Sequence, residues 1–251
     1  MFNFFAKENA DPSGRFYITD TDFNHIKNVL RMKQGDEFLV SYEGASHLCT
    51  LEEISEGQAT AKIITENYQS TELPIFIHLF QGLPKADKME LIIQKCTELG
   101  MSEITPVEMS RCVVKLEEKK KKSKTERWQA IAESAAKQSK RNLVPTVNTP
   151  LSFANVIKAA ENFDLFLVPY ENEDGMKATA DCLSKIKSGM KIGVLIGPEG
   201  GFDDKEIELC RQKGFSSISL GKRILRTETA AITSTAMLML YSEMNLDGGQ
   251  L

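Results

Sequence analysis

Residues 195–202 read LIGPEGGF, and the fold prediction for the C-terminal part of the chain follows from them. The apolar run Lys191–Ile196 has the composition of a buried strand, and three glycines and a proline follow it within five residues. Asp203 then predicts the start of a helix, because Glu206 three residues later is the reciprocal partner of a capping box. A strand, a tight turn and a helix in this order are the repeating unit of a parallel sheet.

The same alternation of strands and helices begins at Leu73. Buried strands are expected at residues 75–80, 103–107, 164–168, 191–196 and 216–220. Apolar residues at helical spacing predict helices at residues 87–99, 124–140 and 230–241. Residues 73–251 therefore predict an α/β domain with a parallel sheet covered on both faces.

The first 70 residues have a different pattern, with short alternating segments rather than long apolar ones. Strands are expected at residues 16–19, 37–41, 47–52 and 58–64, with one helix at residues 22–32. This composition is typical of a small β-barrel that serves as a binding module, and it contains no catalytic motif. The sequence thus predicts two domains, residues 1–70 and residues 73–251.

The composition excludes several classes of protein. Of the 251 residues, 41% are hydrophobic and 26% are charged, the balance of an ordinary globular protein. The longest apolar runs are about five residues, well below the roughly 18 that span a bilayer, and no apolar signal-peptide core follows Met1. The five cysteines are odd in number and contain no C-x-x-C pair, which argues against a disulfide framework and a zinc site. We therefore expect a cytoplasmic, metal-free protein without a membrane segment.

Positive charge is concentrated in one stretch, although the whole chain has a formal net charge of −4. Residues 111–141 contain 11 basic and 4 acidic side chains. Such a patch attracts phosphates, and Lys137 and Arg141 are expected roughly opposite the apolar face of the helix at residues 124–140. The alternative is that the lysines at residues 119–122 form only a solvated loop and helix start.

Two turns at predicted strand ends carry residues that a plain connection does not need. Ligands of parallel sheets bind beyond the carboxyl ends of the strands. The glycines of residues 197–201 allow a ligand to approach the backbone, and Glu199 favours a cationic or neutral ligand over a pyrophosphate. The turn after Leu220 places Arg226 and Glu228 before an apolar helix. The alternatives are a turn without a ligand and a purely structural pair of Arg226 with Glu228.

Motifs for several other chemistries are missing from the sequence. It lacks a G-x-x-x-x-G-K-[ST] phosphate loop, an H-E-x-x-H zinc motif and a G-x-S-x-G nucleophile turn, and the glycine-rich turn is not a G-x-G-x-x-G fingerprint. Cys96 and Trp128 lie on apolar helix faces, so both are expected to be packing residues. Nucleotide hydrolysis, dinucleotide binding, zinc proteolysis and serine hydrolysis are therefore unsupported.

The two turns together carry a family resemblance. LIGPEGGF at residues 195–202 with LGKRILRTETAA at residues 220–231 resembles the signature of the SPOUT methyltransferases, and in particular of the ribosomal small-subunit RNA methyltransferase E family. The similarity continues in HIKNVLRM at residues 25–32, KME at 88–90, QKCTELG at 94–100, ITP at 104–106 and AAKQ at 135–138. Either turn alone is a weak signal, whereas the two together are specific.

This resemblance implies a fold, a cofactor and an assembly. The implied fold is a PUA-like β-barrel over residues 1–70 and a SPOUT α/β domain with a deep trefoil knot over residues 73–251. The implied cofactor is S-adenosylmethionine, and the implied assembly is a homodimer. The residues implied to bind the cofactor are Leu195, Ile196, Gly197, Pro198, Glu199, Gly200, Gly201, Leu220, Gly221, Ile224, Leu225, Arg226, Thr227 and Ala230.

The resemblance also implies a substrate, 16S ribosomal RNA of the small subunit, methylated at a uridine N3. The family usually has a basic residue just before its Phe-Phe pair, and here Asn3 occupies that position. Other basic groups are then expected to hold the RNA. The candidate RNA-binding residues are Arg15, Lys27, Arg31, Lys88, Arg111, Lys137, Lys140 and Arg141.

The implied reaction moves a methyl group from a sulfonium to a ring nitrogen and requires neither a covalent enzyme intermediate nor a metal. Arg226 is expected to stabilise negative charge on the uracil carbonyl oxygens, and Glu228 is the nearest candidate for accepting the imide proton. Two alternatives stay open. One is a SPOUT enzyme that methylates a ribose 2′-oxygen or another base, and the other is a non-catalytic RNA-binding protein with the same fold.

Overall fold

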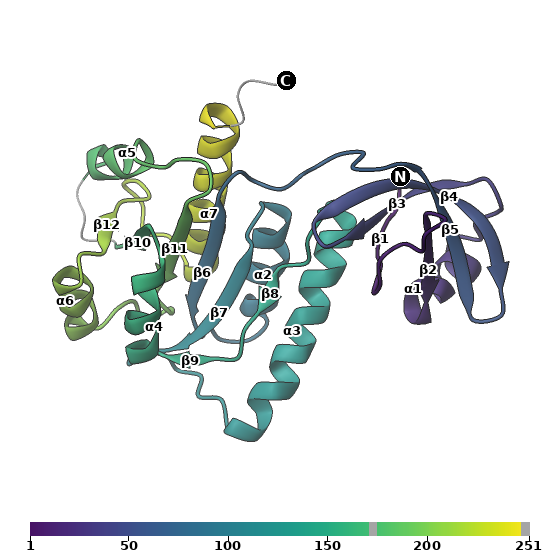
Figure 1. Ribbon diagram of the computed structural model, residues 1–251. Coiled ribbons are helices and arrows are strands. Elements are labelled where there is room, and N and C mark those ends of the chain that lie inside the picture. Colours follow the sequence, from purple (N-terminus) through teal and green to yellow (C-terminus); the bar gives the residue numbers. More distant parts are fainter. Residues whose placement is uncertain (171–174, 247–251) are drawn as a thin grey trace. The chain divides into compact units, whose positions relative to one another are not determined.

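The computed structural model describes residues 1–170 and 175–246, and the chain divides into two compact units (Figure 1). The first unit comprises Met1–Glu72 together with Ala136–Val144. The second comprises Leu73–Ala135 together with Pro145–Leu251. The sequence pattern places residues 136–144 in the second domain, so their return to the first unit is a feature that local patterning does not reveal.

The first unit is built on a five-stranded sheet in the order β1-β3-β4-β5-β2. Its strands are β1 (Asn3–Phe5), β2 (Arg15–Thr19), β3 (Glu37–Tyr42), β4 (Ala45–Ser55) and β5 (Gln58–Thr65). β1 pairs with β3 in parallel, and the other pairs are antiparallel. Alternate residues face the core, as in β2, where Phe16 and Ile18 are buried and Tyr17 is exposed. The four predicted strands are confirmed, while β1 is too short for the pattern to reveal.

The helix predicted at residues 22–32 is shorter and less regular than its pattern indicates. α1 spans Asp20–Asn24, and a π-helical turn follows at His25–Val29. The element ends because Arg31 has a φ of 52°, in the left-handed region that a right-handed helix does not enter. Of the apolar residues expected to form its buried face, Ile26 is fully buried but Val29 is 68% exposed, so the pattern identifies this face only in part and does not reveal the type of helix.

Long-range contacts hold the downstream segment in the first unit. Asn3 donates from Nδ2 to the Arg141 carbonyl oxygen at 2.9 Å, and the Arg141 guanidinium pairs with the Glu72 carboxylate. Lys137 Nζ lies 2.7 Å from Asp22 Oδ1. Arg141 is only 3% exposed, so its predicted position on an open helix face is wrong. Lys137 likewise binds a carboxylate of its own unit. Both cations therefore neutralise acidic groups that the fold brings close to them.

The second unit is a parallel sheet with helices on both faces, as the pattern predicts. Its strand order is β12-β10-β11-β6-β7-β8, with β9 paired to β7, and every described pair is parallel. The strands are β6 (Phe76–Gly82), β7 (Glu103–Glu108), β8 (Thr146–Val147), β9 (Leu151–Ser152), β10 (Leu165–Pro169), β11 (Lys191–Ile196) and β12 (Ser216–Ile218). The helices are α2 (Lys88–Glu98), α3 (Glu118–Gln138), α4 (Phe153–Ala159), α5 (Lys177–Leu183), α6 (Asp204–Gln212) and α7 (Thr227–Asn245).

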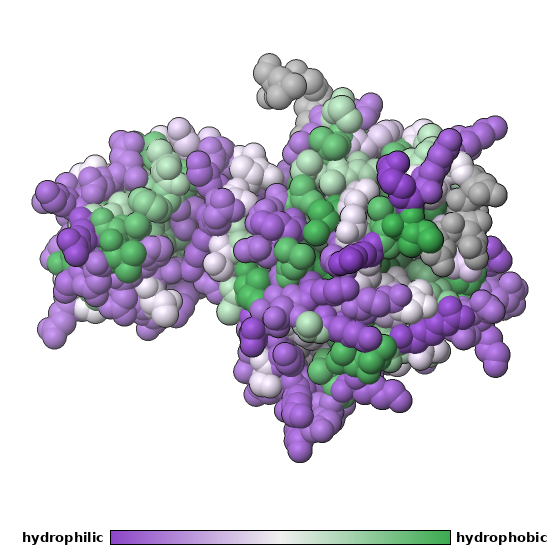
Figure 2. All heavy atoms as spheres, turned by 180° about the vertical axis from the view of Figure 1, so that it is seen from behind, coloured by the Kyte–Doolittle hydropathy of each residue, from purple (hydrophilic) through white to green (hydrophobic). Residues whose placement is uncertain are grey.

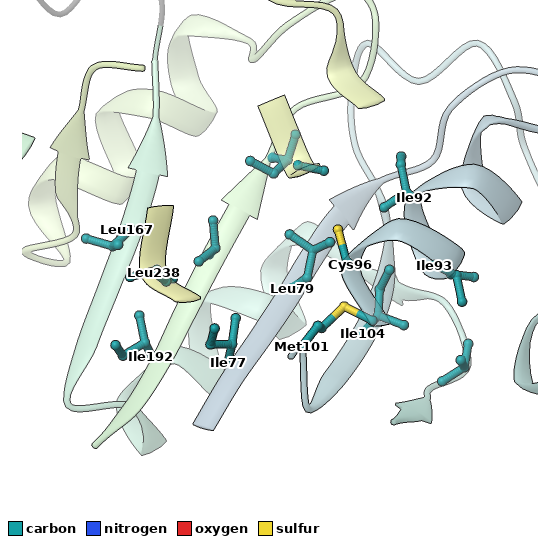
Figure 3. Packing of buried hydrophobic residues seen from close by; sticks show 14 of the residues in the cluster. Ile77, Leu79, Ile92, Ile93, Cys96, Met101, Ile104, Leu167, Ile192 and Leu238 are labelled. Atoms are coloured by element: carbon teal, nitrogen blue, oxygen red, sulfur yellow. The ribbon is translucent and has the colours of Figure 1, made fainter. Parts of the chain in front are cut away.

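Strand alternation divides the core of this unit between the two faces of the sheet. Ile77 and Leu79 of β6 point to one face, where they pack with Cys96 of α2 and Leu238 of α7 (Figure 3). Phe80 belongs to a second cluster on the opposite face, to which α4 and α6 contribute. All five side chains are buried, and Cys96 is a packing residue as predicted.

The strand order creates a topological switch point between β6 and β11. β7 lies on one side of β6, and β11, β10 and β12 lie on the other. Open α/β sheets bind ligands beyond the carboxyl ends of strands at such a point. Here β6 ends at Gln81 and Gly82, and β11 ends at Ile196 before Gly197. The glycine-rich turn therefore lies where the topology favours a site.

α3 and α7 both begin earlier than their patterns predict. α3 starts at Glu118, so the lysines at residues 119–122 lie in its first turns rather than in a loop. Trp128 of α3 is buried, as its place on an apolar helix face predicts. α7 starts at Thr227, with Arg226 as its N-cap residue, so the second turn leads directly into this helix.

Hydrophilic residues cover most of the face of the protein shown in Figure 2, and hydrophobic residues gather in several separate areas. Within the described residues, the helices are too short or too polar to cross a membrane. The same part of the chain brings no three His, Cys, Asp or Glu residues together in a way that suits a metal ion.

Candidate active site

Side-chain hydrogen bonds join the two turns that the sequence singles out. The Gln81 amide nitrogen, at the end of β6, donates to the Gly82 carbonyl oxygen and to the Thr227 hydroxyl oxygen, both at 2.9 Å. The Thr227 hydroxyl donates in turn to the Gly197 carbonyl oxygen at 2.6 Å. Gln81 and Thr227 are buried, so these bonds form in a low-dielectric environment that strengthens them. The structure thus brings the glycine-rich turn and the start of α7 to one place.

A missing side chain lets the glycine-rich turn lie against the sheet. A Cβ atom on Gly82 would lie 2.6 Å from the Pro198 nitrogen, closer than real Cβ contacts occur. In the second turn, Gly221 has a φ of 108°, which residues with a Cβ rarely adopt. Glycine is therefore required at Gly82 for close packing of two backbone segments and at Gly221 for a positive φ angle.

The helix after the glycine-rich turn begins with the capping box that the sequence predicts. Both halves of the box are present, and the Asp203 N–H donates to the Glu206 carboxylate at 2.9 Å. Glu206 also accepts from the Ser110 N–H at 2.9 Å, which ties the loop after β7 to this helix start. Arg111, in the same loop, donates to the Gly200 carbonyl oxygen. Arg111, a candidate RNA contact, therefore lies beside the glycine-rich turn.

A lysine at the start of α2 links the two turns electrostatically. Lys88 Nζ lies 3.1 Å from a carboxylate oxygen of Glu199 and 3.1 Å from one of Glu228. These hydrogen bonds raise the pKa of Lys88. Burial raises the pKa of Glu199, but hydrogen bonds from the Lys85 N–H and from Lys88 outweigh it, so this pKa lies below its usual value. Lys88, a candidate RNA contact, instead holds two site carboxylates in place.

Arg226 stands apart from this ion-pair cluster. It is exposed at the start of α7, and within residues 1–170 and 175–246 no carboxylate pairs with it. Glu228 pairs with Lys88 instead, so the structural pair of Arg226 with Glu228 that the sequence leaves open does not form. The Arg226 side chain is exposed, so the remaining expectation, a ligand anion as partner, stays a prediction. The guanidinium is available to an anionic group of a substrate.

The other residues implied to bind the cofactor follow the carboxyl ends of β11 and β12 and differ in exposure. The buried ones are Leu195, Ile196 and Pro198, the partly exposed ones are Gly197, Gly201, Leu220, Gly221, Leu225 and Ala230, and the exposed ones are Glu199, Gly200 and Ile224. Ile224 is 84% exposed, a large value for an isoleucine. The second turn therefore presents an apolar side chain beside the site.

The candidate RNA-binding residues fall into two groups. The ion-paired ones are Arg15 with Glu52, Lys88 with Glu199 and Glu228, Arg111 with Asp203, Lys137 with Asp22, and Arg141 with Glu72. Lys27, Arg31 and Lys140 are exposed. Asn3 is buried and bonded to Arg141 and Ser41, so it contributes to the packing of the first unit.

A separate cavity of about 420 Å³ lies beside the first half of β6. His78 Nε2 is 2.7 Å from Thr105 Oγ1, and Asn148 donates to both Glu103 and Thr105. Burial lowers the pKa of His78 to about 3, so its ring is neutral at physiological pH. Because these polar groups satisfy one another, we assign the candidate site to the two turns and not to this cavity.

The neutral state of His78 predicts a pH dependence of stability. The unfolded histidine takes up a proton near pH 6.5 and the folded one only near pH 3, so between these values the unfolded state binds more protons. The free energy of unfolding should therefore fall below pH 6.5, by up to about 1.4 kcal/mol per pH unit. Between neutral pH and about pH 5, the parent should lose roughly 1–2 kcal/mol more than His78→Gln in urea unfolding. Equal losses in the two proteins would contradict this assignment.

Sequence reasoning missed two residues that build the site, Gln81 and Gly82, and did not reveal the ion pairs of a third, Lys88. Gln81 and Gly82 end a predicted apolar strand, and a glutamine at a buried strand end is a signal that points to a hydrogen-bonding role. The role of Lys88 had no such signal, because Glu199 and Glu228 lie more than a hundred residues further along the chain.

Comparisons with known proteins agree with one another. A family model described as an RNA methyltransferase domain matches residues 71–239, and one described as an RNA methyltransferase PUA domain matches residues 18–64. The ribosomal RNA small subunit methyltransferase E of Bacillus subtilis (strain 168) is 37% identical over 243 residues, 95% of either chain. The protein of the same name from Synechocystis is 34% identical over 225 residues, 88% of this chain and 71% of the relative.

Solved structures share the fold over nearly the whole chain. A crystal structure of a ribosomal RNA small subunit methyltransferase E from Neisseria gonorrhoeae bound to S-adenosyl methionine covers 96% of this chain and 97% of that one, with a TM-score of 0.83 and 30% identity. A methyltransferase from Legionella pneumophila in complex with the same cofactor covers 95% and 97%, with a TM-score of 0.82 and 30% identity. The expected SPOUT-type α/β fold with a PUA-like N-terminal unit is confirmed. This chain belongs to the ribosomal RNA small subunit methyltransferase E family.

Proposed function

We propose that this protein transfers a methyl group from S-adenosylmethionine to N3 of a uridine in 16S ribosomal RNA. The observation that carries the proposal is the joining of the two turns through Gln81 and Thr227 at the switch point of the sheet. The names of the relatives support small-subunit ribosomal RNA as the substrate, and two solved relatives hold S-adenosylmethionine. The choice of uridine N3 rests on the motif resemblance.

The residues of the two turns suit this cofactor. Gly82 leaves room for the backbone of the glycine-rich turn. The N–H and carbonyl groups of this backbone are the hydrogen-bond partners that the neutral edge of an adenosine requires. Glu199 contributes negative charge beside the turn, which is compatible with a sulfonium cation. Gln81 Oε1 is buried without a hydrogen-bond partner among the described residues, as expected of an atom that a ligand satisfies. The backbone groups of residues 197–201, 220–221 and 224–227 would hold the cofactor.

The residues at the start of α7 carry the proposed chemistry. When bound, S-adenosylmethionine supplies an electrophilic methyl group on a positively charged sulfur. Arg226 donates to a carbonyl oxygen of the base as N3 loses its proton, an interaction worth about 2.7–4 kcal/mol for one well-placed donor. Glu228 accepts that proton, and Lys88 holds its carboxylate at 3.1 Å. Thr227, between them in sequence, is fixed by its two hydrogen bonds and so limits the motion of both.

Exposed lysines of α3 are the proposed phosphate contacts. Lys119, Lys120 and Lys122 expose 80%, 60% and 88% of their side chains, and their glutamate partners lie 3.4 to 4.0 Å away. Exposed pairs of this kind contribute little, so a phosphate displaces the carboxylate at low cost. Lys137 and Arg141 are excluded from the proposal, because each is held by a carboxylate of the first unit.

Replacing Lys119, Lys120 and Lys122 together by glutamine should weaken RNA binding and flatten its dependence on salt. Each lost phosphate contact lowers the slope of log affinity against log salt by about 0.7–0.9. Filter binding of ribosomal RNA over a series of salt concentrations measures this slope. A matched control replaces three other exposed lysines, Lys177, Lys185 and Lys187. If both triple variants show the parent slope, the lysines of α3 are only solvated.

Product analysis tests the proposed reaction. The purified protein is incubated with labelled S-adenosylmethionine and small ribosomal subunits from a strain that lacks this enzyme, and the RNA is then digested to nucleosides. Mass spectrometry is expected to show 3-methyluridine. A ribose-methylated nucleoside or another methylated base would contradict the N3 assignment while keeping the enzyme class. Binding of RNA without any methylated product would contradict the enzyme class itself.

The proposal includes a cytoplasmic homodimer. Leu240 and Met244 of α7 are exposed, on a helix whose buried residues pack in the core shared with α2. Apolar side chains left at the surface of a helix favour contact with a second protein surface. Sedimentation velocity should show two chains per particle, and a single chain at micromolar concentration would contradict the dimer. The trefoil knot implied by the resemblance stays a prediction.

A further inference from the structure

The side-chain oxygen of Gln81 is a buried acceptor between the joined turns. Gln81 is 0% exposed, and Oε1 has no hydrogen-bond partner within the described residues. Leaving a buried acceptor unsatisfied destabilises the folded state, so an atom of this kind in a native protein calls for a specific explanation. Its position at the switch point, next to both turns, points to a hydrogen-bond donor on a ligand.

The neighbouring groups determine which way this amide points. The Gly82 carbonyl can only accept, so the Gln81 atom 2.9 Å away is the amide nitrogen. The Thr227 hydroxyl donates its proton to the Gly197 carbonyl oxygen, so it also accepts from that nitrogen. A flipped amide would place the Gln81 oxygen against two acceptors. The oxygen is therefore the free end of the side chain.

We propose that Gln81 Oε1 accepts a hydrogen bond from a neutral donor on the adenosine part of the cofactor, an amino N–H or a ribose O–H. The inference rests on the proposed function, and it makes Gln81 a specificity-determining contact as well as a link between the turns. Within the described residues, the hydrogen bonds of this side chain go to the uncharged Gly82 carbonyl and Thr227 hydroxyl. Uncharged groups of this kind compensate poorly for the hydration free energy that the cofactor's ammonium group loses on burial. A neutral donor loses much less hydration free energy.

Ligand analogues separate this contact from a purely structural role. Gln81→Met keeps the length of the side chain and removes both polar atoms. Titration calorimetry on the full chain gives affinities for S-adenosylhomocysteine, for 5′-methylthioadenosine, and for S-adenosylhomocysteine analogues that lack the 6-amino group, the 2′-hydroxyl or the 3′-hydroxyl. 5′-Methylthioadenosine lacks the amino-acid part but keeps every donor of the adenosine. Gln81→Met should weaken S-adenosylhomocysteine and 5′-methylthioadenosine by the same factor, about tenfold.

The decisive comparison is with the analogue that lacks the donor in question. For that analogue, the affinity of Gln81→Met should be lower than that of the parent only by the factor that the loosened turns cause. Thr227→Val measures that loss, because it removes the acceptor of Gln81 Nε2 and the bond to Gly197 while Oε1 stays in place. This control should weaken all the ligands by one common factor.

Two outcomes overturn the proposal. One is a loss in Gln81→Met that is uniform over all analogues and equal to that of Thr227→Val, which would leave Gln81 as a link between turns only. The other is a loss confined to ligands that carry the ammonium group. If Gln81→Met loses its cooperative melting, the same comparisons are made with Gln81→Asn, whose shorter side chain withdraws the oxygen from the ligand. Failure of the unaltered protein to bind any of these ligands would contradict the proposed function and is thereby distinguished from failure of this inference.

Discussion

Replacing Arg226 with alanine should slow methyl transfer about 100-fold or more, equivalent to about 2.7 kcal/mol of transition-state stabilisation. Arg226 is exposed and has no carboxylate partner in the described part of the chain, so its removal leaves no unpaired buried charge. The melting temperature should therefore stay near that of the parent. Cofactor affinity should also be unchanged, because the interaction strengthens only as negative charge develops on the base. Single-turnover rates with excess enzyme on small ribosomal subunits isolate this step.

Arg223→Ala is the matched control for this prediction. Arg223 is a second exposed arginine of the same turn, three residues earlier, and its removal should leave the rate near that of the parent. A normal single-turnover rate in Arg226→Ala, combined with markedly earlier melting, would show that Arg226 has a structural role. An equal loss of rate in both variants would mean that the turn contributes only its overall positive charge.

Gly82→Ala should reduce S-adenosylmethionine affinity by more than about 100-fold while leaving the fold intact. The added methyl group would lie 2.6 Å from the Pro198 nitrogen, 2.8 Å from its Cδ and 3.0 Å from the Gly197 carbonyl carbon. Backbone atoms cannot rotate away as a flexible side chain can, so the whole glycine-rich turn must shift from β6. That shift also breaks the alignment of Gly197 with Thr227. Calorimetric titration with S-adenosylmethionine measures the loss.

Gly214→Ala controls for the general cost of an added methyl group. Gly214 has a φ of 77° and nothing within 4 Å of its Cβ position, so this variant acquires backbone strain without a clash and without touching the turn. It should melt earlier than the parent but bind the cofactor with the same affinity. Unchanged affinity in a folded Gly82→Ala protein would remove the glycine-rich turn from the cofactor site.

Features whose causes lie within a few residues could be predicted from the sequence. The strand Lys191–Ile196 is found with the predicted bounds, because its apolar run and the glycines after it are local signals. The capping box of Asp203 and Glu206 is also present, since its two hydrogen bonds span three residues. The two turns were identifiable for the same reason, as each combines a strand end with residues that a plain connection does not need.

Features that depend on partners far along the chain could not be predicted. Helical periodicity indicates that Arg141 lies on a polar face, but its partner Glu72 is 69 residues away, and only the fold shows that the pair is buried. The bond between Gln81 and Thr227 spans 146 residues, so the link between the turns has no local signal. The ion pairs of Lys88 with Glu199 and Glu228 have no local signal for the same reason. The sequence pattern shows where polar groups lie along the chain, and the tertiary structure determines which partners they bind.

The first unit is completed by a segment that the ribosome makes much later than the rest of it. Asn3 and Glu72 leave the ribosome long before Arg141 and Asn142, to which they are hydrogen-bonded in the folded protein. The N-terminal sheet can reach its final packing only after β6, β7 and α3 of the second unit have been synthesised, so the usual order of one domain folding before the next begins does not apply. Recombination between relatives is constrained in the same way. A crossover at Glu72 would join an N-terminal sheet to a returning segment that did not evolve with it.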